Sequence, residues 1–281
     1  MGLFRYTRRT FARELFLLAI GAVFAVPFYI VIVLSLKTNA QIMTSPLSLP
    51  THPDWQNYVQ MWKGTSSGTV TIGRSLINSI VITVVSVVVL ILVGATCGYT
   101  LARRQSKLST ALYFVFVAGL IMPFELGLIP LYVAFRHDHL VGTYVGIILL
   151  QAGLLTPLSV FLYAGFIRAL PREYEEAAQV DGASLWRTLF RVVLPLLRPI
   201  TGTVAVLTGL FCWNDFFYPL IFLSGTSKQT LPVGVFQFTG DFTDQWNLIF
   251  PTVVIALAPM AAFYLFAQKQ FIKGFTGGIR G

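Results

Sequence analysis

Charged side chains are scarce in this 281-residue chain. Only 11% of its residues are Asp, Glu, Lys or Arg, whereas about a quarter of the residues of a soluble domain are charged. Four long segments contain no charged residue at all: 15–36, 75–102, 140–167 and 245–268. Since a helix needs about 20 apolar residues to cross a bilayer, this lack of charge excludes an ordinary soluble protein and indicates a membrane protein.

Two further apolar segments are each interrupted by one acidic residue, Glu125 in the first and Asp215 in the second. The apolar runs are continuous and lack the alternation that is typical of membrane β-barrel strands. We therefore predict an all-α membrane protein with six transmembrane helices, at about 15–36, 76–101, 110–133, 143–167, 200–223 and 247–267.

Acidic residues are fewer than basic ones, 11 against 20, and the net charge is +9. With the N-terminus in the cytoplasm, fifteen Lys and Arg residues fall in cytoplasmic segments and five in external ones. The positive-inside rule therefore predicts that both termini are cytoplasmic. The basic balance is then explained by topology, and we expect no nucleic-acid partner.

This topology divides the chain into five parts. They are a cytoplasmic segment 1–14, a first transmembrane helix 15–36, an extracytoplasmic connection 37–75, a core 76–267 of five transmembrane helices, and a cytoplasmic tail 268–281. The core includes a long cytoplasmic loop, 168–199.

Several kinds of functional site are missing from the sequence. The two cysteines, Cys97 and Cys212, lie in predicted helices and are interpreted as small packing residues rather than a disulfide framework. There is no nucleophile–base constellation, no metal-ligand cluster and no phosphate-binding G-x-x-x-x-G-K-[ST] pattern. We expect no enzyme activity, no catalytic residue and no metal site in this chain.

The loop 168–199 contains the one internal stretch that is rich in charge, EEAAQVDGASLWRTLFRVVLP. Pro171 and the acidic residues after it suit the first turn of a helix, and Asp181-Gly182 is a turn signal. A second helix is predicted from Ala183–Ser184, with one apolar face and an end at Pro195 and Pro199. The face comprises Leu185, Leu189, Val192 and Val193. Such an elbow either covers the ends of its own helices or docks a cytoplasmic partner.

This stretch resembles the EAA loop of ABC-importer permeases. The matching positions are Glu176, Ala177, Ala178, Gly182, Leu194 and Pro195. WNDFFYPLIFLS and the tail QKQFIKGFTGGIRG are similar to the carbohydrate-uptake branch, in particular its smaller, MalG-like permease. The resemblance extends from about Leu15 to Gly281, and Arg280-Gly281 stands where many relatives have Lys-Gly.

The resemblance implies a MetI-like permease core with a cytoplasmic coupling-helix elbow. Glu176 would meet a basic group on a separate ATPase, Gly182 would permit the turn, and Leu194–Pro199 would pass the motion to the fifth span. The elbow's coupling residues would also include Glu175, Asp181 and Ala183. ATP and Mg would bind to the partner ATPase, and this chain would hold no cofactor.

The partners implied by the resemblance are a second, MalF-like permease, a cytoplasmic ABC ATPase dimer, an extracytoplasmic solute-binding protein, a carbohydrate and the lipid bilayer. The binding protein would face the external segment 224–246, and the tail from Phe271 would reach toward the ATPase dimer interface. The location would be the cytoplasmic (inner) membrane of a bacterium or archaeon.

Ionisable groups inside a membrane span are costly and are candidates for function. Such groups here are Glu125 and Asp215, and Asn214 precedes the latter. Trp213, Phe216 and Tyr218 place aromatic rings beside them, which suits sugar rings and hydroxyls. The alternative is that these residues lie at the outer interface or pair with helix ends exposed by Pro123 and Pro219.

Two other functions remain open at this point. One is an ABC permease for a non-sugar solute such as glycerol phosphate or a polyamine, because an EAA loop by itself does not define the solute. The other is a self-contained six-helix carrier or channel. The sequence offers no paired N-P-A half-helices and no evident inverted repeat in its favour.

Overall fold

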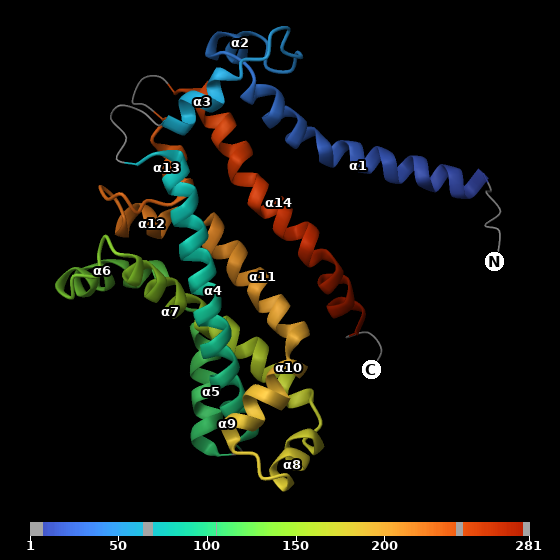
Figure 1. The fold of residues 1–281 in the computed structure, drawn as a ribbon, viewed down its shortest axis with the longest axis vertical. Coiled ribbons are helices and arrows are strands. Elements are labelled where there is room, and N and C mark those ends of the chain that lie inside the picture. The colour runs from blue at the N-terminus through green and yellow to red at the C-terminus, as the bar shows by residue number, and fades with distance from the viewer. Residues whose placement is uncertain (1–7, 64–69, 105, 240–243, 278–281) are drawn as a thin grey trace. The chain divides into compact units, whose positions relative to one another are not determined.

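The computed structural model describes residues 8–63, 70–104, 106–239 and 244–277 (Figure 1). All regular structure in these residues is helical, which confirms the predicted all-α class. The extreme N-terminal residues 1–7 and Arg280-Gly281 of the tail, both expected in the cytoplasm, lie outside the described part.

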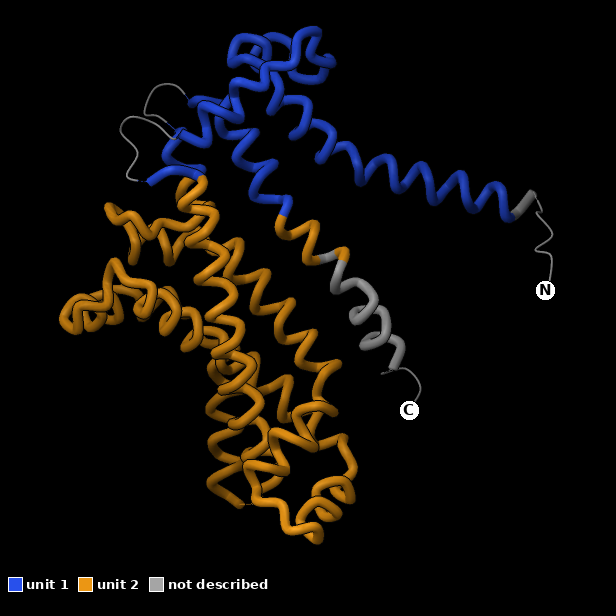
Figure 2. The backbone as a smooth tube through the Cα atoms, viewed as in Figure 1, with its two compact units in different colours: residues 1–72, 235–258 blue, residues 73–234, 259–281 orange. Residues whose placement is uncertain are grey.

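The chain divides into two compact units (Figure 2). Unit 1 consists of Met1–Ile72 and Val235–Ala258, and unit 2 of Gly73–Gly234 and Pro259–Gly281.

Unit 1 contains α1 (Arg8–Ser35), α2 (Asn39–Thr44), α3 (Gln56–Lys63) and the first half of α14 (Trp246–Gly277). Asn57 of α3 is buried, and its amide donates to the carbonyls of Ser35 (3.2 Å) and Lys37 (3.0 Å). Its carbonyl oxygen accepts from the Asn247 amide of α14 at 3.1 Å. The end of α1, α3 and the start of α14 are therefore joined through one buried amide.

Lys37 is also buried in unit 1, with 1% of its surface exposed. Its ammonium donates to the carbonyls of Ser45 (2.5 Å) and Pro46 (3.2 Å) and to the Ser48 hydroxyl (3.1 Å). A buried charge is stable only when it is hydrogen-bonded in this way. Lys37 therefore connects the loop after α2 to the end of α1.

Unit 2 contains the remaining helices. Its long helices are α4 (Ile72–Arg103), α7 (Tyr144–Ala169) and α11 (Arg198–Asn214), with the second half of α14. Its shorter elements are α5 (Lys107–Gly119), the 3-10 turn η1 (Phe124–Gly127), α6 (Leu128–His137), α8 (Glu173–Val180), α9 (Leu185–Thr188), the π-helical turn η2 (Leu189–Val193), α10 (Leu194–Leu196), α12 (Phe217–Phe222) and α13 (Leu231–Phe236), the last of which ends in unit 1.

Helices α4 and α7 pack closely because small residues face each other. A Cβ atom built on Gly94 would lie 2.0 Å from the Ser159 hydroxyl, and one on Gly98 would lie 2.7 Å from the Tyr163 Cβ. Ser159 donates across this contact to the Leu90 carbonyl at 2.8 Å. Small residues and a bridging hydroxyl are a common way for membrane helices to approach each other.

Four helices in the described residues are long and apolar enough to cross a membrane, and up to six spans result if each of two bent pairs counts as one. The four are Thr10–Ser35, Ile72–Arg103, Tyr144–Ala169 and Trp246–Phe263. They agree with four of the predicted spans. Helix α14 continues beyond its predicted end to Gly277, so the tail begins as helix.

The other two predicted spans are wrong as single straight helices. Segment 110–133 is broken after α5, and α5 meets η1–α6 at a bend of 93°. Pro123 precedes η1 and lacks the N–H that a continuous helix would need. Segment 200–223 is also interrupted: α11 stops at Asn214, Asp215 is extended, and α12 begins at Phe217.

The elbow also departs from its prediction in detail. Helix α8 starts at Glu173, so Pro171 precedes the helix instead of opening it. Pro195 does not end the second helix, which continues as α10 to Leu196 and then bends by 78° into α11. Within unit 2, α8–α10 and the pair α6 and α12 lie at opposite ends of α4 (Figure 1).

Candidate functional site

The two breaks in unit 2 border an open pocket of about 810 Å³, which we call the break pocket. It is lined from residues in 119–125 and 211–218, together with three leucines of α7, Leu154, Leu155 and Leu158. Most of this lining is apolar, with the polar exceptions Glu125, Asn214 and Asp215. The pocket therefore combines aromatic walls with two carboxylates at the interruptions of two apolar segments.

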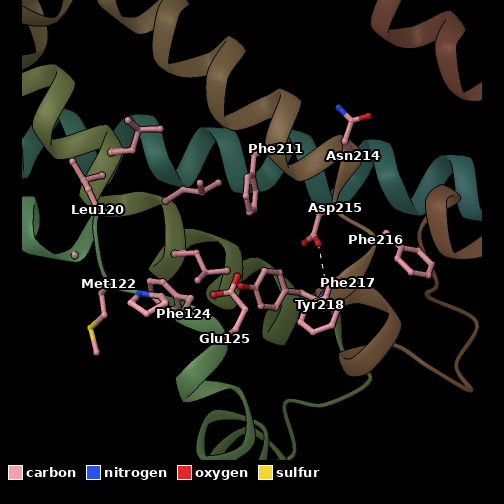
Figure 3. Close-up of a pocket in the computed structure, with 15 residues that line it drawn as sticks. Leu120, Met122, Phe124, Glu125, Phe211, Asn214, Asp215, Phe216, Phe217 and Tyr218 are labelled. Carbon is pink, nitrogen blue, oxygen red and sulfur yellow. Dashed lines mark hydrogen bonds between the residues drawn. The ribbon is translucent and has the colours of Figure 1, made fainter.

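Asp215 is buried at the edge of this pocket, with 9% of its surface exposed. Its Oδ1 accepts from the Tyr218 backbone N–H at 3.2 Å, so the carboxylate caps the start of α12. Its Oδ2 accepts from the Gln151 side chain of α7 at 3.1 Å. Figure 3 shows the Asp215 carboxylate directed toward the same space as Glu125 and the Tyr218 ring.

Gln151 continues the polar chain into the helix bundle. It is fully buried, and its Oε1 accepts from the Ser86 hydroxyl of α4 at 3.0 Å. This bond orients the amide so that its NH₂ group faces Asp215. Helices α4, α7 and the end of α11 are therefore joined at one level. Our sequence analysis missed Gln151 and Ser86, although a glutamine inside the charge-free run 140–167 was a usable signal.

The aromatic cluster predicted around Asp215 is only partly gathered at the pocket. Phe216, Phe217 and Tyr218 line it, whereas Trp213 is buried and is absent from its lining. Asn214 is at the rim, but its amide donates to the Leu210 carbonyl of its own helix at 2.8 Å. In Figure 3 its side chain points away from Asp215.

The second candidate region is the elbow at the other end of unit 2. Gly182 lies between α8 and α9 with φ +77°, a conformation that an L side chain rarely adopts. The Ser184 side chain then accepts from the Arg187 N–H and starts α9 at Leu185, as predicted. The two helices of the elbow therefore meet at a turn that depends on glycine.

The two adjacent glutamates of the elbow line one pocket but differ in burial. Glu176 is exposed, together with Ala177, whereas Glu175 is 7% exposed. The Glu175 carboxylate accepts from Arg103 and from the Tyr99 hydroxyl, both on α4. Of the other predicted coupling residues, Asp181, Gly182 and Pro195 are exposed, and Ala178, Ala183 and Leu194 are half-buried.

The predicted apolar face of the second elbow helix is divided in the structure. Leu189 and Val193 are buried against Tyr99, Tyr163 and other residues of one core cluster, but Leu185 is 63% exposed. Leu185 is the first residue of α9, and together with Trp186 and Leu189 it lines a pocket beside Tyr99 and Arg103 of α4. The exposed large side chains of the elbow include Tyr174, Val180, Leu185, Trp186 and Phe190.

Comparison with known proteins agrees with these features. Residues 91–275 match the protein family described as binding-protein-dependent transport system inner membrane component. The chain is 35% identical to the melibiose/raffinose/stachyose import permease protein MelC of Bacillus subtilis (strain 168), over 90% of each chain. It is 33% identical to the probable starch degradation products transport system permease protein AmyC of Thermoanaerobacterium thermosulfurigenes, again over 90% of each.

The fold is similar to that of a solved chain in a bacterial ABC transporter involved in the import of the acidic polysaccharide alginate. The TM-score is 0.77, and the match covers 94% of this chain and 98% of that one at 22% identity. The likeness therefore extends over nearly the whole fold.

Proposed function

The chain belongs to the family of inner membrane components of binding-protein-dependent transport systems, and we propose that it is the permease subunit through which a carbohydrate crosses the cytoplasmic membrane of a bacterium or archaeon. In this proposal both termini are cytoplasmic. The chain acts with a second, MalF-like permease, an ATPase dimer that binds ATP and Mg, and an extracytoplasmic solute-binding protein.

The elbow carries the coupling part of this proposal. Its open side presents the Glu176 carboxylate beside apolar side chains, including Leu185 and Trp186, which are 63% and 65% exposed. Trp186 and Phe190 are stacked with ring centroids 6.0 Å apart. Exposed aromatic and aliphatic groups among charged side chains suit a helix that enters a groove on another protein. We assign that groove to the ATPase.

The break pocket supports the transport part. Carboxylates accept hydrogen bonds from hydroxyl groups, and aromatic rings provide apolar faces for sugar rings. Glu125 and Asp215 provide the carboxylates, and Phe216, Phe217 and Tyr218 provide the aromatic rings. All five line the pocket, whose volume is about 810 Å³. Relatives named for melibiose, raffinose and stachyose, and for starch degradation products, support a saccharide as the solute.

The first test is purification of the tagged chain from its host in mild detergent, followed by mass spectrometry. We expect a second permease and about two copies of an ATPase per copy of this chain. The purified complex in proteoliposomes, with its binding protein, is then tested with radiolabelled raffinose and maltotriose, with and without ATP. Saccharide uptake that proceeds without ATP through the chain alone contradicts the proposal and indicates a self-contained carrier.

A matched pair of variants tests the docking role of the elbow. Glu176→Lys reverses the exposed charge and is expected to abolish ATP-driven uptake and recovery of the ATPase, while the amount of chain in the membrane is unchanged. Glu173→Lys makes the same charge reversal at another exposed glutamate of α8 and is expected to behave as wild type. Normal uptake by Glu176→Lys contradicts the docking assignment.

A further inference from the structure

The buried Glu175 joins the elbow to two membrane helices. Arg103, at the last residue of α4, approaches its Oε1 with Nε at 2.7 Å and Nη2 at 2.6 Å. The Tyr99 hydroxyl donates to Oε2 at 2.9 Å. Tyr99 and Arg103 are four residues apart, so they share one face of α4. We call Tyr99, Arg103 and Glu175 the α4 latch.

Arg103 also reaches the end of α7. Its Nη2 donates to the carbonyl of Leu170, the C-cap residue of α7, at 3.1 Å. A guanidinium has donors in a fixed planar fork, which suits simultaneous contacts of this kind. One side chain therefore links the cytoplasmic ends of α4 and α7 to the first turn of α8.

The latch is both enclosed and charged. The side chains of Arg103 and Glu175 are 12% and 9% exposed. Apolar residues of similar size often stabilise such a place at least as well as a buried ion pair does. A buried pair differs from apolar packing in that it defines one geometry, because each donor must meet its acceptor. Definite placement of α8 on α4 is therefore the property that the latch supplies.

Along the chain, α8 follows α7 through the short connection 170–172, which leads to α7 and not to α4. In the other direction, movement of α8 must pass the Gly182 turn, the π turn η2 and the 78° bend before it reaches α11. Each of these places can absorb part of a displacement by local backbone adjustment. The latch has no such joint between α8 and α4, because its hydrogen bonds connect the two helices directly.

We propose that Arg103 is a positioning residue for energy coupling, which acts through Glu175 to pass movement of the elbow to α4 and α7. This inference rests on the proposed function, because it presupposes that the ATPase moves the elbow. It adds a link to α4 beside the connections that run along the chain into α7 and α11. It also gives the two adjacent glutamates separate tasks: Glu176 faces the partner, and Glu175 holds the elbow to its own bundle.

The test needs a readout of access to the pathway that does not require the solute to be known. In the assembled complex, Cys97 and Cys212 are replaced by alanine and Glu125, which lines the break pocket, by cysteine. The rate at which a membrane-impermeant maleimide modifies this cysteine is measured with and without ATP, Mg and vanadate. ATP hydrolysis is measured in the same preparation.

In the reference protein we expect ATP to change the modification rate by about fivefold or more, the lower end of coupling factors between linked sites. Glu175→Gln is expected to reduce this response to less than about twofold while ATP hydrolysis continues. The charge exchange Arg103→Glu with Glu175→Arg is expected to restore at least part of the response. Glu173→Gln is the matched control and keeps the full response.

A full ATP response in Glu175→Gln overturns the latch proposal, as does an exchange variant that hydrolyses ATP without any recovery. If Glu175→Gln does not assemble, Arg103→Lys decides the question, because it keeps the positive charge but lacks the planar fork that reaches both Glu175 and the Leu170 carbonyl. A reduced response with continued ATP hydrolysis supports the proposal, and a full response overturns it. If ATP changes the modification rate in neither the reference protein nor Glu173→Gln, the proposed function itself fails, and the latch proposal fails with it.

Discussion

Replacement of Gly98 by alanine is expected to separate α4 from α7. The added Cβ would lie 2.7 Å from the Tyr163 Cβ and 3.0 Å from the Ala164 backbone nitrogen. Neither atom can turn away, since one is backbone and the other is fixed to it. Tyr163 and Ala164 are both fully buried, so the helices themselves must move apart.

The magnitude follows from two opposing effects. Overpacking of a tight interior costs about 1–3 kcal/mol. Because the added Cβ meets atoms that cannot move aside, we expect Gly98→Ala to cost about 3 kcal/mol. Alanine improves helix propensity by about 1 kcal/mol over glycine. The net loss is therefore about 2 kcal/mol, which corresponds to a fall in Tm of about 4–8 °C for a chain of this size.

The assay is the Tm of the purified chain in mild detergent, followed by tryptophan fluorescence. Gly165→Ala is the matched control on α7, because a Cβ there has no neighbour within 4 Å. It keeps the propensity gain without the collision, and its Tm should equal or exceed that of wild type. Equal Tm values for Gly98→Ala and Gly165→Ala would refute the packing argument.

Three further substitutions test other parts of the structure. Asn78→Ala removes an amide that donates to the Ser227 and Gln229 carbonyls and accepts from the Tyr144 hydroxyl. The groups left without a partner should lower the free energy of unfolding by about 2–4 kcal/mol. The expected result is a lower Tm and faster proteolysis within 224–230. Lys37→Met deprives three oxygens of their donor and should expose 45–48 to elastase, whereas the exposed Lys63→Met should not. Gly182→Ala should lower the stability of the turn by about 1–2 kcal/mol and reduce ATP-driven saccharide uptake, and Gly182→Asn should reduce it less. Equal uptake by wild type, Gly182→Ala and Gly182→Asn would count against a required left-handed turn.

The amino-acid sequence by itself determined the class of the protein. The absence of charge over lengths that match a bilayer left only membrane helices as an explanation, and four such helices are found where they were predicted. The EAA pattern also identified the family, because its spacing lies within one continuous stretch of 20 residues from Glu176 to Pro195. Information of this kind is local, so it can be read without knowledge of the fold.

Only the tertiary structure decided which residues act together. Glu175 and Glu176 are chemically identical neighbours, and a rotation of about 100° per residue turns one toward Arg103 and the other toward solvent. The sequence offered the helix breaks near Pro123 and Asp215 only as an alternative, because their flanking residues are as apolar as a continuous span.

The chain from Ser86 through Gln151 to Asp215 shows the same limit. Its successive members are 65 and 64 residues apart in the sequence. The periodicity within one helix does not indicate which residue of another helix it contacts. Burial made these groups meet, because a polar side chain among packed apolar helices is stable only beside a hydrogen-bond partner. The sequence therefore supplied the polar groups, and the packing of α4 against α7 and α11 paired them.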